Sequence, residues 1–238
     1  MLAEKRLGRY LIYAIGEIFL VVIGILIALS INNWNSERLD AKKERLFLLE
    51  IKENLNEDLQ NLDAILEFNE LKIKTIDTAF YFLSIMEENP MVGRDFSNLF
   101  AVITRYESFT PVSVAFDNII ASGKIDILSS DELRKQISRY YSKDDWGGVQ
   151  AQLIVSTQNF VGEVAPKMMN KNMMRANTKL EFDVRSVEEI TVYKDPDVLS
   201  GLFVLQNKSM QVKKILNQVK TETKCIIESI DAYLDKDH

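Results

Sequence analysis

Residues 10–31 form one continuous apolar run that is interrupted by a single charged residue, Glu17. A helix needs about 20 predominantly apolar residues to cross a hydrocarbon layer about 30 Å thick, so this run is long enough to span a membrane. It also exceeds the roughly 7–15 apolar residues of a usual secretory signal, although Ala28-Leu29-Ser30 would pass as a cleavage site. We therefore expect a retained transmembrane helix over 10–31, with a cleaved signal as the alternative.

The basic residues that flank this run predict its orientation. Lys and Arg occur on both sides, but those on the N-terminal side lie closer, with Arg9 next to the first apolar residue. Because positive residues near the membrane tend to stay on the cytoplasmic side, we expect residues 1–9 to be a short cytoplasmic tail. Residues 32–238 are then an extracytoplasmic domain. Arg9, Tyr10 and Trp34 are the expected anchors at the two membrane interfaces.

Glu17 lies inside the apolar run, where a charged side chain costs ~2.5–3.5 kcal/mol to insert. At about 100° per residue it shares one helix face with Gly24 and Ala28, a pair of small residues that lets two helices approach closely. We expect this face to associate with another helix; the alternative is that Glu17 extends toward the lipid headgroups. The residues of this association face are Gly16, Glu17, Leu20, Gly24 and Ala28.

The segment from Arg9 to Arg38 carries a recognisable pattern, with Ile15-Gly16-Glu17 near its start and Asn32-Asn33-Trp34-Asn35 near its end. It resembles the opening of a family of single-span membrane proteins of Gram-negative bacteria, a domain family of unknown function. The resemblance is specific over residues 6–40 and looser as far as Tyr141. It implies an uncleaved helix and an inner-membrane location, and it implies no activity.

Residues 37–89 contain neither Gly nor Pro, and apolar residues recur there at alternating spacings of four and three. This pattern predicts a long helix with one seam that faces a helical bundle. Asn69 lies on the seam, where a polar residue is expected to fix the register. The six acidic residues between Glu53 and Glu70 are expected to form a solvated face. The seam residues are Leu55, Leu59, Leu62, Leu66, Asn69, Ile73, Ile76 and Phe80.

Several shorter helices are expected after Pro90. They cover 97–105, 113–122 and 129–142, the last opened by a capping box from Ser129 to Glu132. Gly147-Gly148 is expected to interrupt the helical pattern before a further stretch over 149–164.

Asp195-Pro196 supplies an N-cap and a first-turn proline for a last helix that runs to Asp235. We expect this helix to pack antiparallel against the first one in an elongated bundle. The fold class is therefore all-α, with a small β-ribbon or an extended loop near 178–193.

The residue inventory excludes several kinds of chemistry. The single histidine is His238 and the single cysteine is Cys225, which excludes His-based catalytic triads, His zinc sites and cysteine zinc clusters. A net charge of −6 disfavours nucleic acid as a partner. We expect no enzymatic activity, no cofactor and no metal. The clustered Met168, Met169, Met173 and Met174 are expected to pack in a core rather than hold Cu(I).

These observations favour a membrane-anchored helical interaction module. Its expected partners are the lipid bilayer and either a second copy, in a homo-oligomer, or another membrane protein, as an accessory subunit of a cell-envelope complex. The alternative is an extracytoplasmic small-molecule sensor that signals through a partner. That alternative requires a pocket between the helices with converging polar groups, for which the candidates are Arg105, Tyr106, Tyr140 and Tyr141.

Overall fold

The structure, a computed structural model, describes residues 2–89, 91–143, 145–168 and 192–236, and describes only the backbone at 2–14, 145, 146, 165 and 168. The described residues contain helices and turns and no strand, so the predicted all-α class is confirmed. The ribbon or extended loop expected near 178–193 lies outside the described residues, except that its end belongs to the 3₁₀ helix η2, Val192–Lys194.

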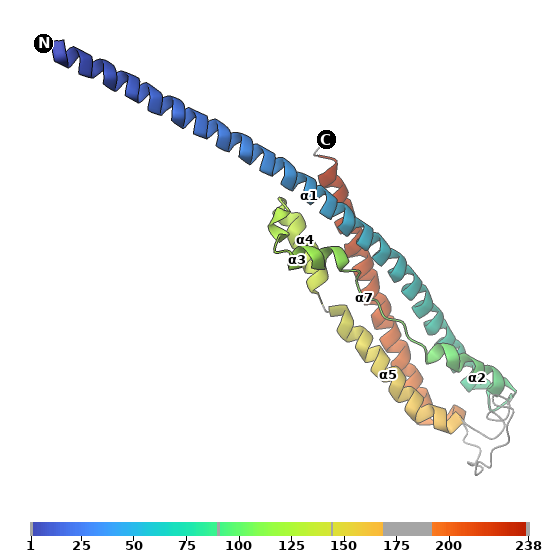
Figure 1. The fold of residues 1–238 in the computed structure, drawn as a ribbon. Helices are drawn as coiled ribbons and strands as arrows, with labels where there is room; N and C mark the ends of the chain where they lie inside the picture. Colours follow the sequence, from blue (N-terminus) through green and yellow to red (C-terminus); the bar gives the residue numbers. More distant parts are fainter. Residues whose placement is uncertain (1, 90, 144, 169–191, 237–238) are drawn as a thin grey trace, which may run out of the picture.

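A single helix, α1 (Leu2–Ile85), dominates the fold and contains 84 residues. At 1.5 Å per residue it is about 125 Å long. The apolar run at 10–31 therefore continues into the bundle helix without a break. The first part of α1 projects from the rest of the chain, and the second part forms one side of the bundle (Figure 1).

The last helix, α7 (Pro196–Leu234), runs antiparallel to α1 along the length of the bundle (Figure 1). Four polar pairs between the two helices fix their register. Successive pairs are 11, 7 and 7 residues apart along α1, and they are the same numbers of residues apart, in the reverse direction, along α7. The pairs are Lys52–Asp231, Asp63–Lys220, Glu70–Lys213 and Asp77–Gln206. The predicted antiparallel pairing of the first and last helices is thus observed.

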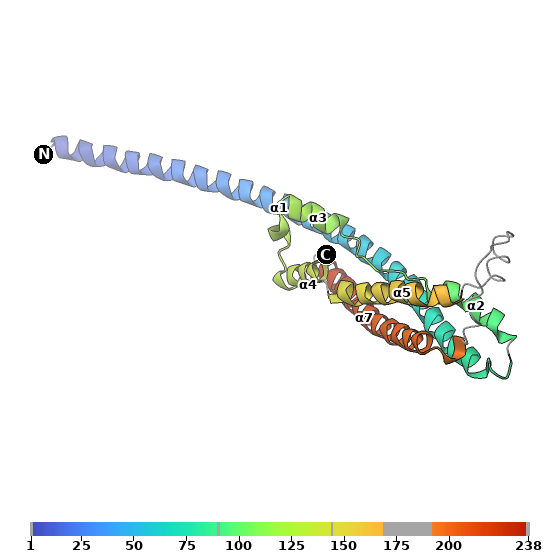
Figure 2. The ribbon, with the colours of Figure 1, turned by 90° about the horizontal axis from the view of Figure 1, so that it is seen from below.

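Four shorter helices and two 3₁₀ helices, one of them η2, complete the described part of the bundle, and the four helices are seen in Figure 2. Helix α5 (Asp145–Met168) packs along α7, and α2 (Val92–Ile103) packs on α1 near its C-terminal end. The elements α3 (Val114–Ala121), η1 (Ile125–Ile127) and α4 (Asp131–Ser142) lie near the point where α1 leaves the bundle.

The two glycines at 147 and 148 do not interrupt a helix, contrary to expectation. The break comes earlier, at Lys143, whose backbone is extended, and α5 runs through both glycines and through Pro166 near its end. A helical glycine costs only about 1 kcal/mol relative to alanine, and the packing of α5 along α7 outweighs that cost. The helix expected over 97–105 begins earlier than expected, at Val92.

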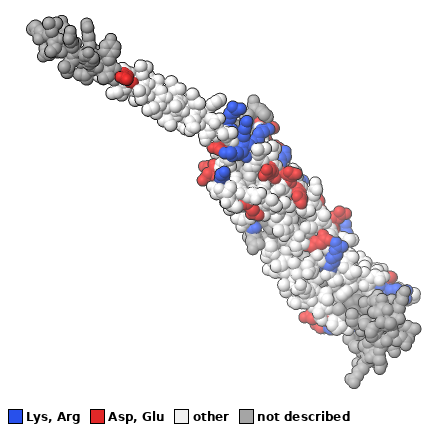
Figure 3. Space-filling model, viewed as in Figure 1, with Lys and Arg blue, Asp and Glu red and all other residues white. Residues whose placement is uncertain are grey.

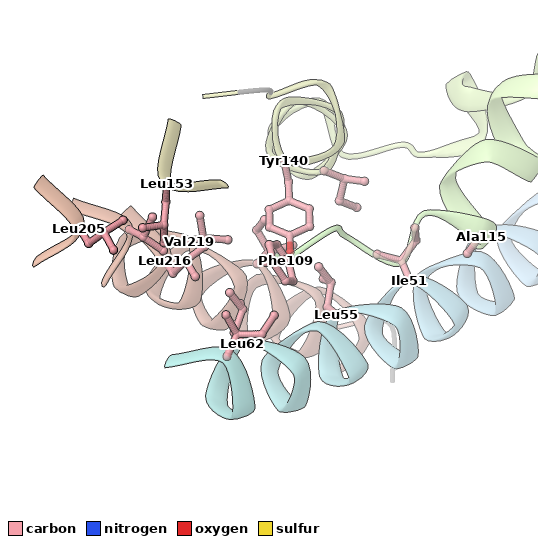
Figure 4. Packing of buried hydrophobic residues seen from close by; sticks show 14 of the residues in the cluster. Ile51, Leu55, Leu62, Phe109, Ala115, Tyr140, Leu153, Leu205, Leu216 and Val219 are labelled. Carbon is pink, nitrogen blue, oxygen red and sulfur yellow. The ribbon is translucent and has the colours of Figure 1, made fainter. Parts of the chain in front are cut away.

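The core lies between α1, α7 and the shorter helices (Figure 4). Leucines such as Leu62 of α1 and Leu216 of α7 are fully buried, and burying such a side chain contributes about 1.5–3 kcal/mol. Tyr140 of α4 points into the same space beside Phe109 (Figure 4). Of the eight seam residues, Leu55, Leu62, Asn69 and Ile76 are buried, and Leu59, Leu66, Ile73 and Phe80 are half-buried.

Candidate functional site

The projecting part of α1 is the most distinctive surface of the molecule. Every side chain described from Ile15 to Lys43 is exposed. An 18-residue window near the N-terminus has a mean hydropathy of 2.4, and none of it is buried. By length and composition, this is the one helix among the described residues that could cross a membrane. The projecting helix carries a long uncharged stretch before charged side chains begin at the bundle (Figure 3).

The predicted association face lies on this projecting helix. All five of its residues are exposed: Gly16, Glu17, Leu20, Gly24 and Ala28. A Cβ atom added at Gly16 or Gly24 would meet no atom within 4 Å, so no described part of the chain covers the backbone at these positions. The face is therefore available for contact with another helix.

The predicted membrane anchors are described in part. The exposed Trp34 ring lies 6.0 Å from the Arg38 guanidinium carbon, measured to the ring centroid, which is a cation–π contact. Arg9 and Tyr10 lie in the backbone of α1, but their side chains are outside the described residues. The methionines 169, 173 and 174 and the side chain of Met168 are also outside them.

A connecting segment, residues 104–113, joins α2 to α3 along the bundle without regular secondary structure. Buried backbone groups need hydrogen-bond partners, and polar side chains of the core supply them here. Lys72 donates to the Arg105 carbonyl (2.8 Å), and Asp58 accepts from the Val112 amide (2.8 Å). The Gln150 side chain binds both the amide and the carbonyl of Phe109, at 2.6 and 3.2 Å. These buried polar residues hold the connecting segment in place.

Asp58 is fully buried, although it belongs to the acidic run that was expected to be solvated. Its second oxygen accepts a hydrogen bond from the Tyr140 hydroxyl at 2.8 Å. Burial raises the pKa of the Asp58 carboxyl to about 6, against the lowering effect of its two hydrogen bonds. Burial is also the main cause that raises the pKa of Tyr140, so this hydroxyl stays protonated.

Lys72 is fully buried as well, and no acidic residue among those described pairs with it. Its second contact is the Thr157 hydroxyl, at 3.4 Å. Burial lowers the pKa of the Lys72 ammonium to about 8, because the side chain loses its solvation and has no acidic partner among the described residues. A buried cation bound only by neutral groups costs stability.

Glu44 is the first buried residue among the described side chains of α1, at the point where the helix joins the bundle. Its carboxylate accepts bonds from the Ser129 amide (2.8 Å) and from the Tyr233 hydroxyl (3.0 Å). The Ser129 hydroxyl binds it too, so Ser129 does not cap α4 as expected. Ser130 is the N-cap and accepts from the Leu133 amide. Glu44 thereby joins α1 to the start of α4 and the end of α7.

Of the four residues proposed for a sensor pocket, Tyr106 is exposed, and Arg105 lies far from Tyr140 and Tyr141. Arg105 lies over the Phe68 ring, whereas Tyr140 binds Asp58, about 15 Å away along α1. A hollow of about 580 Å³ is an open groove lined by Phe68, Leu71, Arg105 and neighbouring charged residues. Arg105 pairs there with Glu107, so the charges of the groove are largely balanced by one another. Tyr141 lines a separate hollow of about 280 Å³.

Sequence reasoning did not single out Glu44, Asp58, Lys72 or Gln150. One signal was present for Asp58, which follows Leu55 by three residues and precedes Leu62 by four and so fits the seam spacing. The other three have no local signal, because their partners lie 33 to 189 residues away. No group of three or more His, Cys, Asp or Glu residues suited to a metal occurs in the described part of the chain.

Comparison with known proteins gives one match. Residues 17–193 match a family of unknown function, DUF6090. No curated protein and no solved structure matches the chain. The match includes residues 17–31 of the apolar run and most of the bundle, and it ends before α7.

Proposed function

Since the chain belongs to the DUF6090 family, whose function is unknown, we propose from its geometry that it is a membrane-anchored helical interaction module. The apolar part of α1 spans the inner membrane of a bacterial cell. Residues 1–9 stay in the cytoplasm and the bundle stands in the periplasm. The module works as a homo-oligomer or as an accessory subunit of a cell-envelope complex.

The observation that carries this proposal is the exposed apolar helix at the N-terminus. Its large side chains from Ile15 to Ile31 project from the bundle with no cover from described residues. Exposed apolar surface of this extent is unfavourable in water and marks contact with lipid or with another protein. A bilayer covers such a helix on all sides, and the 22 residues of the run suit its thickness.

Association is proposed through the face of Glu17, Gly24 and Ala28. Without water to drive helix pairing, transmembrane helices associate through close packing of small residues and through hydrogen bonds between polar ones. Glu17 supplies the polar group and Gly24 supplies the open backbone. A second helix on this face would give the Glu17 carboxyl a partner and reduce its cost in the membrane.

The bundle is proposed to have no catalytic role and to bind no cofactor or nucleic acid. Its buried polar side chains Asp58, Lys72 and Gln150 are bound to the chain's own connecting segment rather than directed into a cavity. The open groove beside Arg105 has no buried polar group aimed into it, so no specific observation favours the sensor alternative.

The test is co-purification of two differently tagged copies after gentle detergent extraction of membranes. We expect the two tags to co-purify, and we expect Glu17→Leu and Gly24→Leu to reduce the yield several-fold. Leu26→Phe is the matched control, because residue 26 lies on the opposite side of the helix from Glu17. Recovery of the tags only as separate monomers, with no other polypeptide, would overturn the proposal.

A further inference from the structure

We propose that a second copy of this chain pairs in parallel with the neck segment, residues 32–49 of α1, in the same register as the membrane-spanning helix. The inference rests on the proposed function and extends its association face out of the membrane. The neck segment is unusual because, up to Lys43, it is a single helix that no described part of its own chain covers.

The neck segment carries apolar side chains on a solvent-exposed face. Leu39 is 47% exposed, Leu46 62% and Leu49 43%. They take core positions of a heptad seam at spacings of seven and three, and the core position between Leu39 and Leu46 is held by Lys42. Leu48 lies nine residues after Leu39, about two and a half turns, so it points to the opposite side of the helix, where it is fully buried in the bundle. The exposed seam thus faces away from the bundle, and a second copy can pair there without a clash.

This seam continues the association face of the membrane helix. Because 18 residues make about five full turns, residues that far apart on a continuous helix lie above one another. Leu46 therefore lies above Ala28, Leu49 above Ile31, and Leu39 above Val21, which neighbours Glu17. The backbone of α1 is helical throughout this stretch, so one face runs from Glu17 to Leu49.

Charge favours a second copy as the occupant, in parallel orientation. In a parallel coiled coil, a residue just before one core position faces a residue five positions later on the partner helix. With Leu46 and Leu49 as core residues, Arg45 of one copy faces Glu50 of the other, and the reverse holds too. Both side chains are exposed, and neither forms an ion pair with another described residue of its own chain.

The preceding heptad, about two turns nearer the membrane helix, carries like charges at the equivalent positions, Arg38 and Lys43. Lys43 is bound to Asp40 of its own chain at 2.7 Å, which offsets its charge. The Arg45–Glu50 pairs are therefore the polar contacts that discriminate between a paired and an unpaired neck segment.

Disulfide cross-linking of the full-length chain in membranes tests the inference. In a Cys225→Ala background, single cysteines are placed at Leu39, Leu46 and, as a control, Glu37. Residue 37 is exposed and lies nine residues from Leu46, on the opposite side of the helix. We expect Leu39→Cys and Leu46→Cys to form dimers under mild oxidation about tenfold faster than Glu37→Cys, because a disulfide requires Cα atoms within about 7 Å.

Exchanging the charges at residues 45 and 50 gives a second test, because a variant that merely failed to fold would not be rescued by the second substitution. Arg45→Glu should lower cross-linking through Leu46→Cys about fivefold, and adding Glu50→Arg should restore it. Equal cross-linking at residues 37, 39 and 46, or no rescue by the double exchange, would overturn the inference.

A single cysteine at Ala28 distinguishes pairing of the neck segment from association of the membrane-spanning helices, which is the proposed function. Cross-linking at Ala28→Cys without cross-linking at Leu39→Cys would overturn the pairing of the neck segment and support association through the span. An absence of cross-links at both positions would overturn both. Cross-linking at residue 39 alone would support pairing of the neck segment and overturn association through the span.

Discussion

The Asp58 carboxylate and the Tyr140 hydroxyl lie 2.8 Å apart in the core, joined by a hydrogen bond that links α1 to α4. The other carboxylate oxygen holds the Val112 amide, so one buried acid connects two helices and the segment between α2 and α3. Tyr140 also accepts a bond from Thr223 of α7, at 3.3 Å. This network lies where α1, α4 and α7 meet. Its one acidic group, the Asp58 carboxyl, changes charge with pH.

The first prediction concerns Asp58→Asn. The asparagine oxygen can still accept from the Val112 amide, and its amide can donate to the Tyr140 oxygen. Both contacts therefore persist without a buried charge, although the Tyr140 hydroxyl hydrogen loses Asp58 as its acceptor. We expect the variant to be more stable than the wild type at pH 8 by about 1–2 kcal/mol. Thermal unfolding of the full-length chain in detergent measures this, with the exposed neighbour Glu57→Gln as the control.

The sign of the pH dependence follows from the raised pKa of Asp58. This carboxyl has a pKa of about 6 in the folded state and an ordinary value of 3.8, so the folded state binds the proton more tightly. The stability that Asp58 contributes is therefore fully present below pH 3.8 and is lost as pH rises through about 6. The advantage of Asp58→Asn should grow from pH 5 to pH 8. A variant that is less stable by the same amount at both pH values would contradict the prediction.

The second prediction concerns Lys72→Met. Burial lowers the pKa of this ammonium from 10.5 to about 8, so holding its charge at pH 7 costs stability. Replacing it by a methionine of similar length removes that cost but leaves the Arg105 carbonyl without its donor. We expect a net gain of about 1–2 kcal/mol at pH 7, read from the unfolding temperature.

The pH range of the Lys72 effect differs from that of Asp58. Because the folded-state pKa is depressed, the wild type gains stability as pH rises from about 8 to 10.5, and Lys72→Met should lack that gain. Lys74→Met, at an exposed position two residues on, should leave the profile unchanged. A drop in unfolding temperature at pH 7 would show that the hydrogen bond to Arg105 outweighs the buried charge.

The third prediction concerns Glu44, which ties α1 to Ser129 and Tyr233 where the helix leaves the bundle. Glu44→Ala leaves the Ser129 amide and hydroxyl without their acceptor, and we expect it to lower stability by about 1–3 kcal/mol. Glu44→Gln keeps one acceptor oxygen and should cost less. Exposed Glu53→Ala is the control.

Hydrogen exchange gives the local readout for the same site. Amides near Ser129 at the start of α4 should exchange faster in Glu44→Ala than in the wild type, while those in the middle of α7 should not change. Unaltered exchange near Ser129 would mean that Glu44 does not hold this end of the bundle.

The periodic parts of the fold could be predicted from the sequence. Leu55 and Leu62 of α1 and the Asp195-Pro196 start of α7 carry local signals, because helix periodicity and capping depend on residues a few positions apart. Asp195 accepts bonds from the amides of residues 197 and 198, as an N-cap should. The antiparallel pairing of α1 and α7 followed from their lengths and seams.

The errors arose where distant contacts override local signals. Ser129 and Ser130 are equally good capping residues in sequence, and the choice is made by Glu44, 85 residues away, which binds Ser129. Asp58 looked like one member of a solvated acidic face, and only the position of Val112 and Tyr140 shows why it is buried. No short pattern encodes such pairs.

The last prediction compares two helical glycines, Gly201 of α7 and Gly162 of α5. A Cβ added at Gly201 would lie 2.5 Å from Cδ2 of the Phe160 ring, whereas one added at Gly162 would meet nothing within 4 Å. Phe160 is buried and its ring lies 5.7 Å from that of Phe100, so it cannot move without disturbing the core. We expect Gly201→Ala to cost about 1–3 kcal/mol from overpacking.

Gly162→Ala should instead stabilise the chain by up to about 1 kcal/mol, because alanine is the better helix former and the site is open. Unfolding temperatures of the two variants should therefore move in opposite directions from the wild type. Phe160→Leu, which shortens the ring side chain, should recover part of the loss in Gly201→Ala although it costs stability alone. Equal stability of Gly201→Ala and Gly162→Ala would contradict the close packing of Gly201 of α7 against the Phe160 ring of α5.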